Sequence, residues 1–232
     1  MNSFFFWHLT FAHFLTDYPL QTDKLFEKKT KSVLGILIHG LLLFSSMFLF
    51  LLPFSFSLNV LFGIILITIL HILQDKFKVF LSYREEIGEN FFYYVIDQLL
   101  HIFIIFIFSK YYSLPEVKEK GLWFEPFFFK ILTFIIIVTY AYWILLYSIE
   151  YTFFKYNNLI QGKMKFWGFV ERGSSFFLYF LNPFLSLIPF ISTLYFIFNF
   201  KEKEVKFFYV FRSFSGIILT ILTAFLFYNF IL

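Results

Sequence analysis

The chain has 232 residues, of which 60% are hydrophobic and only 15% are charged, and its mean hydropathy is +0.78. A soluble domain cannot bury that much apolar surface, and runs of about 20 apolar residues, the length that crosses a bilayer, recur along the whole chain. The net charge of +4 lies in the connections between these runs, so it bears on membrane topology and not on nucleic acid, which we do not expect as a partner. Cysteine is absent, which excludes disulfides and thiolate metal ligands.

We expect an all-α, polytopic transmembrane helix bundle that forms a single membrane domain, with about seven spanning helices. In chain order the apolar runs are roughly 3–22, 32–55, 58–80, 90–112, 125–150, 174–199 and 206–231. Cytoplasmic loops carry an excess of Lys and Arg, so the strongly basic first connection, KLFEKKTKS, and the third and fifth connections are placed in the cytoplasm. The N-terminus then lies outside and the C-terminus lies in the cytoplasm, in a multi-pass protein of the cell (plasma or inner) membrane.

The first four runs contain nearly all the ionisable residues at membrane depth. We therefore divide the domain 1–232 by function into a four-helix part, 1–112, and three additional helices, 113–232. Four of the five histidines in the chain belong to this polar set. In helix order its members are His13 and Asp17, His39, His71 and Asp75, and Asp97 and His101.

Three of these helices carry a histidine and an aspartate four residues apart, as in HILQD at His71 and Asp75. Residues at this spacing lie one turn apart on the same helix face, so both side chains can reach one ion. The two histidines of the H-E-x-x-H zinc motif use the same spacing. Imidazole nitrogen and carboxylate oxygen suit zinc, and also manganese or ferrous iron. A carboxylate in hydrocarbon is costly unless it is paired, and a divalent cation is an effective partner.

The order within each pair follows the alternation of the helices. His precedes Asp in the first and third helices, whereas Asp97 precedes His101 in the antiparallel fourth helix. The aspartates therefore lie one turn nearer the cytoplasm than the histidines, and all seven candidate ligands fall in one layer. One ion could bind some of them while the rest form a second shell or supply a general base. Alternatively, two ions could share the set with an aspartate between them.

Simpler interpretations are available for each residue. A single His–Asp pair is more often a hydrogen bond or ion pair between helices than a ligand set. Three equally spaced pairs with a fourth histidine at matched depth favour a metal site instead. Bis-histidine haem ligation would leave the aspartates without a role. His8, outside the set, is expected to be a packed or interfacial residue.

The motifs AHFLTDYPLQTDKLFEKK, LIHGLLL, HILQDKFK and VIDQLLH, within residues 10–105, resemble a bacterial membrane protein family of unknown function, domain of unknown function 3307. Its pattern is a histidine followed by D-[FY]-x-L-Q, then H-x-x-x-D-x-x-K and D-Q-x-x-H. The resemblance implies a shared helical fold and a shared polar cluster, but no activity. The type of site is also similar to that of intramembrane metal-dependent hydrolases, which likewise place His and Asp on several helices.

The favoured hypothesis is a membrane-embedded, metal-dependent hydrolase acting on a lipid or lipid-linked substrate at the cytoplasmic leaflet. One or two divalent ions, zinc before manganese or iron, would be its cofactor, and a remaining aspartate, Asp17 or Asp75, would be the catalytic base. A transporter for divalent cations or protons is the second hypothesis, since membrane carboxylates and histidines are common relay groups. A structural or accessory subunit is the third. The substrate and the oligomeric state are left open.

Overall fold

The computed structural model describes residues 3–84, 90–111, 125–155, 163–198 and 203–230, and these residues form helices and no strand. The all-helical prediction is confirmed. Five of the described helical segments are long and apolar enough to cross a membrane, as in a membrane protein: Val33–Phe50, Leu58–Leu81, Phe91–Tyr111, Pro126–Phe154 and Lys206–Asn229. The count of seven crossings, the orientation of the termini and the membrane in which the protein resides stay predictions.

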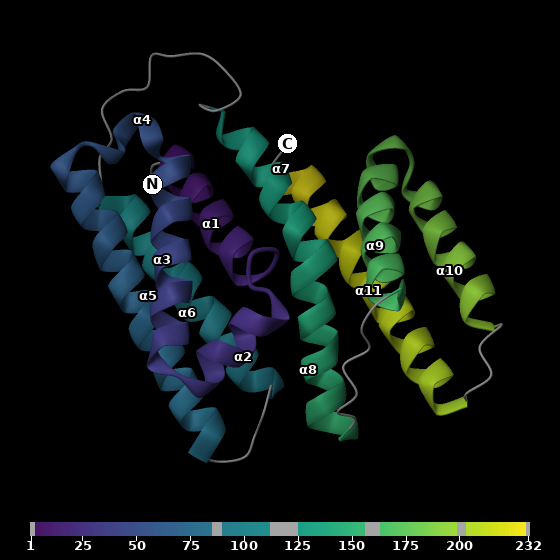
Figure 1. Ribbon diagram of the computed structural model, residues 1–232. Coiled ribbons are helices and arrows are strands. Elements are labelled where there is room, and N and C mark those ends of the chain that lie inside the picture. The colour runs from purple at the N-terminus through teal and green to yellow at the C-terminus, as the bar shows by residue number, and fades with distance from the viewer. Residues whose placement is uncertain (1–2, 85–89, 112–124, 156–162, 199–202, 231–232) are drawn as a thin grey trace. The chain divides into compact units, whose positions relative to one another are not determined.

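The chain forms two compact units, Met1–Thr133 and Phe134–Leu232. The helices of unit 1, coloured purple to teal in Figure 1, are α1 (Ser3–Asp17), α2 (Asp23–Lys31), α3 (Val33–Phe50), α4 (Leu52–Ser55), α5 (Leu58–Arg84), α6 (Phe91–Tyr111) and the first part of α7 (Pro126–Ile136). Helix α3 packs against α1, α2 and α5, while α6 packs against α1 and α5. The functional division expected after residue 112 falls where the structure describes nothing, and it stays a prediction.

The first helix is shorter than the expected run 3–22, because α1 ends at Asp17. Proline has no backbone N–H, so Pro19 cannot donate to the carbonyl oxygen of Leu15. That oxygen instead accepts from the backbone N–H of Leu20 at 3.0 Å, and the chain turns. The basic connection that follows is also ordered, since most of it forms α2.

Helices α3 and α6 each continue their buried face from an apolar half into a polar half. On α3 the buried residues Leu43 and Met47 follow His39 at intervals of four, and on α6 the buried Ile105 follows His101 in the same way. Residues four apart share a face of a helix. The apolar core and the polar set are therefore built on the same helix faces, one above the other.

The opposite faces of these helices are apolar and exposed. On α5 the exposed large side chains recur at helical spacing: Phe62, Ile65, Ile69, Leu73, Phe77 and Phe80. In water this arrangement, with charges inside and phenylalanines outside, would be strongly unfavourable. It suits a bundle whose surroundings are lipid tails and whose polar groups must find partners inside the protein.

Unit 2 begins within α7, which continues through a single π-helical turn, η2 (Ile137–Ala141), into α8 (Tyr142–Phe154). The remaining elements of unit 2, green to yellow in Figure 1, are α9 (Lys163–Leu181), η3 (Pro183–Leu187), α10 (Ile188–Phe198) and α11 (Lys203–Phe230). The expected run 174–199, whose Asn182, Pro183 and Pro189 indicate a distorted helix, is interrupted in the structure, because α9 ends at Leu181. Asn182 is extended and its side chain accepts from the Phe184 N–H, so Pro183 starts a new turn, and α10 packs back against α9.

We predict that Gly35→Ala destabilises the protein. A Cβ at Gly35 would lie 2.2 Å from the backbone carbonyl of Lys28 and 2.5 Å from the Lys29 nitrogen, so α2 would have to move away from α3. Overpacking of this kind costs about 1–3 kcal/mol, more than the helix propensity that alanine adds. We expect a lower midpoint in thermal unfolding of the purified protein in detergent.

Gly173→Ala is the matched control, because a Cβ there meets only the Thr139 Cγ2 atom at 3.5 Å, an ordinary contact. The control should be as stable as the wild type or slightly more stable. A Gly35→Ala protein with an unchanged midpoint would contradict the close packing of α2 on α3.

Candidate metal centre

The seven side chains singled out in the sequence meet at one end of unit 1, where α1 ends and α6 begins. They come from four helices and all are buried, the most exposed being Asp97 at 8%. In helix order they are His13 and Asp17 on α1, His39 on α3, His71 and Asp75 on α5, and Asp97 and His101 on α6. We call these residues the polar cluster.

Four atoms form the centre of this cluster. The Nε2 atom of His39 lies 3.1 Å from Asp17 Oδ1, 3.1 Å from His71 Nε2 and 3.5 Å from Asp75 Oδ2. The Nε2 atom of His71 lies 3.5 Å from Asp17 Oδ1 and 3.3 Å from Asp75 Oδ2. Two imidazole nitrogens and two carboxylate oxygens from three helices thus converge on one point.

These separations match the edges of a metal coordination tetrahedron. A zinc ion bonds imidazole nitrogen and carboxylate oxygen at about 2.0–2.2 Å, which puts tetrahedral ligands about 3.3–3.5 Å apart. The five separations measured between the four atoms run from 3.1 to 3.5 Å. The ligand atoms therefore already stand at the distances that a tetrahedral ion of this size requires.

Hydrogen bonds alone do not satisfy this centre. A neutral imidazole carries one ring proton, so His39 and His71 bring at most two Nε2 protons to five close contacts. Asp75 Oδ2 has no hydrogen-bond partner among the described residues, and neither has His39 Nδ1. A cation would use all four lone pairs at once, which two protons cannot do.

The other three members of the polar cluster lie beside this centre. The His101 ring stacks on the His71 ring with centroids 4.1 Å apart, and its Nε2 lies 3.3 Å from Asp97 Oδ1. The His13 ring lies 5.0 Å from His101 and 5.4 Å from His71, centroid to centroid. Neither ring nitrogen of His13 has a hydrogen-bond partner within the described part of the chain. Asp97 and His101 also reach Asp75 closely enough to form a second potential ligand group.

Two lysines complete the cluster, and the sequence analysis did not assign either to it. Lys29 Nζ lies 2.8 Å from Asp75 Oδ1 and donates to the side-chain oxygen of Gln21 at 3.2 Å. Lys78 Nζ lies 2.9 Å from Asp97 Oδ2. The signal for Gln21 and Lys78 was present in the family motifs, which include the Q of D-[FY]-x-L-Q and the K of H-x-x-x-D-x-x-K.

Local structure explains how Lys29 reaches the site. The Thr22 side chain caps α2 by accepting from the Leu25 N–H at 3.3 Å, and the Ser32 side chain caps the start of α3 by accepting from the Gly35 N–H at 3.1 Å. Leu25 and Lys29, four residues apart, form the buried face of α2. The capped helix lies across the end of the bundle and points one ammonium group inward.

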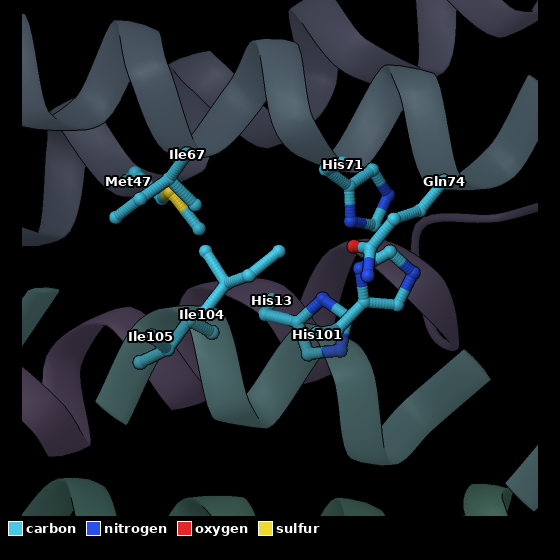
Figure 2. Close-up of a pocket in the computed structure, with 8 residues that line it drawn as sticks. All are labelled: His13, Met47, Ile67, His71, Gln74, His101, Ile104 and Ile105. Atoms are coloured by element: carbon cyan, nitrogen blue, oxygen red, sulfur yellow. The ribbon is translucent and has the colours of Figure 1, made fainter. Parts of the chain in front are cut away.

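A small cavity borders the polar cluster (Figure 2). Its polar side is formed by His13, His71, Gln74 and His101, and its apolar side by Met47, Ile67, Ile104 and Ile105. The space is on the order of one water molecule in size. The cavity lies where the polar half of the helix bundle meets its apolar half.

The fifth histidine lies outside the cluster, as expected. His8 Nδ1 donates to the carbonyl oxygen of Phe4 at 2.7 Å, and its ring packs between Phe4 and Phe129 with centroids 3.8 Å from each. His8 is fully buried in an aromatic environment, which makes it a matched control for the cluster histidines.

Unit 1 is therefore a helical bundle of a membrane protein with a buried His–Asp–Lys cluster, parts of which could hold a metal ion. Residues 5–128, more than half of the chain, match the family described as Protein of unknown function (DUF3307), and the chain belongs to that family. The match covers every member of the polar cluster and ends before unit 2. No curated protein and no solved structure matches the chain.

We predict that Lys29→Met destabilises the metal-free protein strongly. The substitution keeps the length and the apolar stem of the side chain but leaves Asp75 without its ammonium partner in a buried position. Breaking a buried ion pair by removing one member costs about 3–5 kcal/mol. We expect this loss in the free energy of unfolding, measured by denaturant titration in the presence of a chelator.

Lys24→Met on the same helix is the control, because Lys24 is exposed. It should change the free energy of unfolding by no more than about 0.5 kcal/mol. Equal effects of the two substitutions would show that Lys29 does not hold Asp75 in the folded protein.

Proposed function

We propose that the protein is a membrane-embedded, metal-dependent hydrolase that acts on a lipid or lipid-linked substrate. The observation that carries this proposal is the convergence of His39 Nε2, His71 Nε2, Asp17 Oδ1 and Asp75 Oδ2 at separations of 3.1–3.5 Å. Two nitrogen and two oxygen ligands suit zinc first, and manganese or iron next. A divalent ion would supply Lewis acidity, which polarises a carbonyl or phosphoryl oxygen and activates water.

The charges of the cluster favour an anionic reactant. Three buried carboxylates face two lysines, the buried Lys29 and the partly exposed Lys78, so one negative charge is left over. A divalent cation would turn this into one positive charge, because it brings two. A single anionic group, either hydroxide or an anionic oxygen of the substrate, then restores neutrality in a low-dielectric site. We therefore favour a substrate with a phosphate or carboxylate next to the bond that is cleaved.

The remaining side chains can handle protons. We assign Asp17 and Asp75, which were expected as bases, to the ion, and we assign the role of general base to His13. Its ring nitrogens have no hydrogen-bond partner among the described residues, and it faces the cavity together with His71 and His101. Histidine is the side chain whose ordinary pKa suits proton transfer near neutral pH. His101 Nε2 also lacks a hydrogen-bond partner among the described residues, but it lies 3.3 Å from Asp97 Oδ1. His13 Nδ1 is farther from its aspartate, 3.9 Å from Asp17 Oδ1, so we assign His101 to orientation and not to proton transfer.

The outer surface of unit 1 supports a lipid substrate. The outward faces of its helices are apolar and exposed, as Leu73 and Phe77 are on α5, so they would contact the acyl or prenyl chain of a substrate in the bilayer. The helix α2, beside the cluster, exposes Lys24, Lys28 and Lys31, which suit an anionic cytoplasmic leaflet. We therefore place the reaction at the cytoplasmic side of the cell membrane.

Proton or cation transport is a second candidate, and one observation favours it. The four cluster histidines lie in contact with one another, with ring centroids 5.2 Å apart from His39 to His71, 4.1 Å from His71 to His101 and 5.0 Å from His101 to His13. Such a group could relay protons together with the aspartates. The enzyme is preferred because the four-atom centre has the spacing of ligands around one ion.

We predict that the purified protein binds about one equivalent of zinc, manganese or iron per chain, and that His39→Ala loses it. His39 Nε2 contacts each of the other three centre atoms, so its removal leaves three ligands at most. Metal content would be measured by mass spectrometry after purification without chelator. His8→Gln, with its substitution in the aromatic core, should retain the metal.

We predict that His13→Gln keeps the metal but loses activity. Removing a general base typically lowers the rate about 10²–10⁴-fold while ligand binding persists. The assay would follow cleavage of anionic phospholipid esters and phosphodiesters by the metal-loaded protein in proteoliposomes, with His8→Gln as the control. A metal-loaded wild type that cleaves none of these lipids, but moves protons or divalent ions across the vesicle membrane, would replace the hydrolase with the transporter.

A further inference from the structure

Unit 2 contains a second set of buried charges that the proposed hydrolase does not use. Glu150 on α8, Glu171 and Arg172 on α9, and Arg212 on α11 are each at most 3% exposed. Arg212 and Glu150 form a two-armed ion pair, with Nε 2.7 Å from Oε1 and Nη2 2.5 Å from Oε2. The sequence suggested that Glu150 and Arg172 mark helix ends and that Arg212 extends to the membrane surface, whereas all three are buried.

Arg172 carries a fixed charge at membrane depth. Its Nε donates to the carbonyl oxygen of Val138 at 2.7 Å, and its Nη2 donates to that of Thr139 at 2.9 Å. Both acceptors lie in the π-helical turn η2, near the middle of the apolar span Pro126–Phe154. A guanidinium group keeps its proton, and among the described residues no carboxylate oxygen lies within 4.0 Å of this one. Its charge therefore has no direct counter-ion.

Glu171, the next residue, is the member of the set whose charge can change. Its Oε1 accepts from the Ser213 hydroxyl at 2.6 Å. No lysine, arginine or histidine nitrogen of the described residues lies within 4.0 Å of its carboxyl group. Burial favours the protonated carboxyl, whereas the uncompensated charge of Arg172 favours the carboxylate. These opposing effects allow the group to take up and release a proton.

The charge balance of unit 2 depends on this one proton. With both carboxylates ionised, Glu150 and Glu171 offset the two arginines and the set is neutral, whereas a protonated Glu171 leaves one positive charge. The helices packed against α9 do not supply another charge at this point. The titratable groups that face it from η2 and α11, besides Arg212, are phenols, which are neutral near pH 7, and α10 contributes a hydroxyl: Tyr140, Tyr209 and Thr193. The element η3 (Pro183–Leu187) contains no titratable residue.

A small cavity connects Glu171 to two unsatisfied donors. Glu171 and Arg212 line it together with Trp143 and Ser213, and the space is on the order of one water molecule in size. Two donors at its wall, Arg212 Nη1 and Trp143 Nε1, have no acceptor in the described part of the chain. Arg212 and Trp143 are only 2% and 4% exposed. Neither atom can accept a hydrogen bond, so both require an acceptor inside the cavity.

One water molecule meets these requirements by size and by chemistry. It can accept from Arg212 and from Trp143 with its two lone pairs, and it can donate to Glu171, since a carboxylate accepts up to about four hydrogen bonds. A buried water typically makes about three hydrogen bonds, which is the number that these groups offer. The water would then connect the titratable carboxyl group to the rest of the cavity.

We propose that Glu171 is a proton-binding site at membrane depth, reached through one ordered water that Arg212 and Trp143 hold in the cavity. The water gives a proton to the Glu171 carboxylate and takes one from water outside, so that it is regenerated and the carboxylate becomes a carboxylic acid. Release follows the same steps in reverse. Trp167, which lines the cavity and is 45% exposed, marks the side on which protons enter. The site is independent of the metal centre, since all its residues belong to unit 2.

Infrared difference spectroscopy of the full-length protein in lipid vesicles tests the proposal, over a range of about pH 5 to pH 9. A carboxylic acid has a C=O stretching band that is separate from the bands of a carboxylate. We expect a band of this kind that grows reversibly as the pH falls and is missing from Glu171→Gln. The aspartates of unit 1 are present in both proteins, so they do not contribute to the comparison. Glu125→Gln, which replaces an exposed carboxylate, is the control and should keep the band.

Two further substitutions test the groups that hold the proton site. Ser213→Ala removes a hydrogen bond to the carboxylate, so the midpoint of the titration should move about one unit to higher pH. Trp143→Phe removes only an indole N–H that anchors the water, and it should move the midpoint in the same direction by about half a unit. Ser174→Ala is the matched control, because the Ser174 hydroxyl donates to the backbone carbonyl oxygens of Val170 and Glu171. Its midpoint should equal that of the wild type.

The proposal is overturned if no carboxylic acid band titrates in this range, or if the titrating band persists in Glu171→Gln. If Glu171→Gln does not fold, the shift in Ser213→Ala assigns the band, and an unchanged midpoint in that variant rejects the assignment. An unchanged midpoint in folded Trp143→Phe would remove the water from the account. Thermal unfolding of each variant in detergent confirms that folded proteins are compared.

Discussion

The cost of burying charge in a chain that is apolar on its outside determines most of this structure. In unit 1, three carboxylates lie among helices whose outer faces carry exposed leucine, isoleucine and phenylalanine. Each of these carboxylates is at most 8% exposed, so each needs a partner inside the protein. Lys29 and Lys78 supply two such partners, for Asp75 and Asp97. Asp17 has no lysine partner among the described residues and lies in the four-atom centre with His39, His71 and Asp75. The proposed cation would satisfy all four atoms together.

This requirement also explains the local structure around the cluster. Pro19 stops α1 just after Asp17, and two capped helix starts, at Thr22 and Ser32, then hold α2 across the end of the bundle. Gly35 permits the close approach that brings the Lys29 ammonium to Asp75. In unit 2, two carbonyl oxygens of the π-helical turn, those of Val138 and Thr139, accept hydrogen bonds from the buried Arg172 guanidinium. In both units, irregular backbone is found where a buried charge needs a ligand.

The part of this arrangement that sequence could predict is the part encoded within single helices. The spacing of four between His71 and Asp75, and its repetition on two other helices, identified the polar cluster and the depth at which it lies. Contacts between distant segments were not predictable in this way. Lys29 lies in a basic connection that we interpreted as a marker of the cytoplasmic side. The short helix α2 buries only one apolar residue, Leu25, so the sequence has no apolar pattern that would indicate a helix there. Likewise, Glu150 and Arg212 are 62 residues apart, and nothing in either local sequence indicates that they pair.

The central claim is that four side-chain atoms of unit 1 bind one divalent cation, and anomalous X-ray diffraction tests it most directly. Crystals of protein purified without chelator would be measured on both sides of the absorption edge of the bound metal. The account predicts a single strong peak about 2.0–2.2 Å from His39 Nε2, His71 Nε2, Asp17 Oδ1 and Asp75 Oδ2. An intact cluster with no peak at its centre, in crystals soaked with zinc, would contradict it and leave the four atoms as a hydrogen-bonded network.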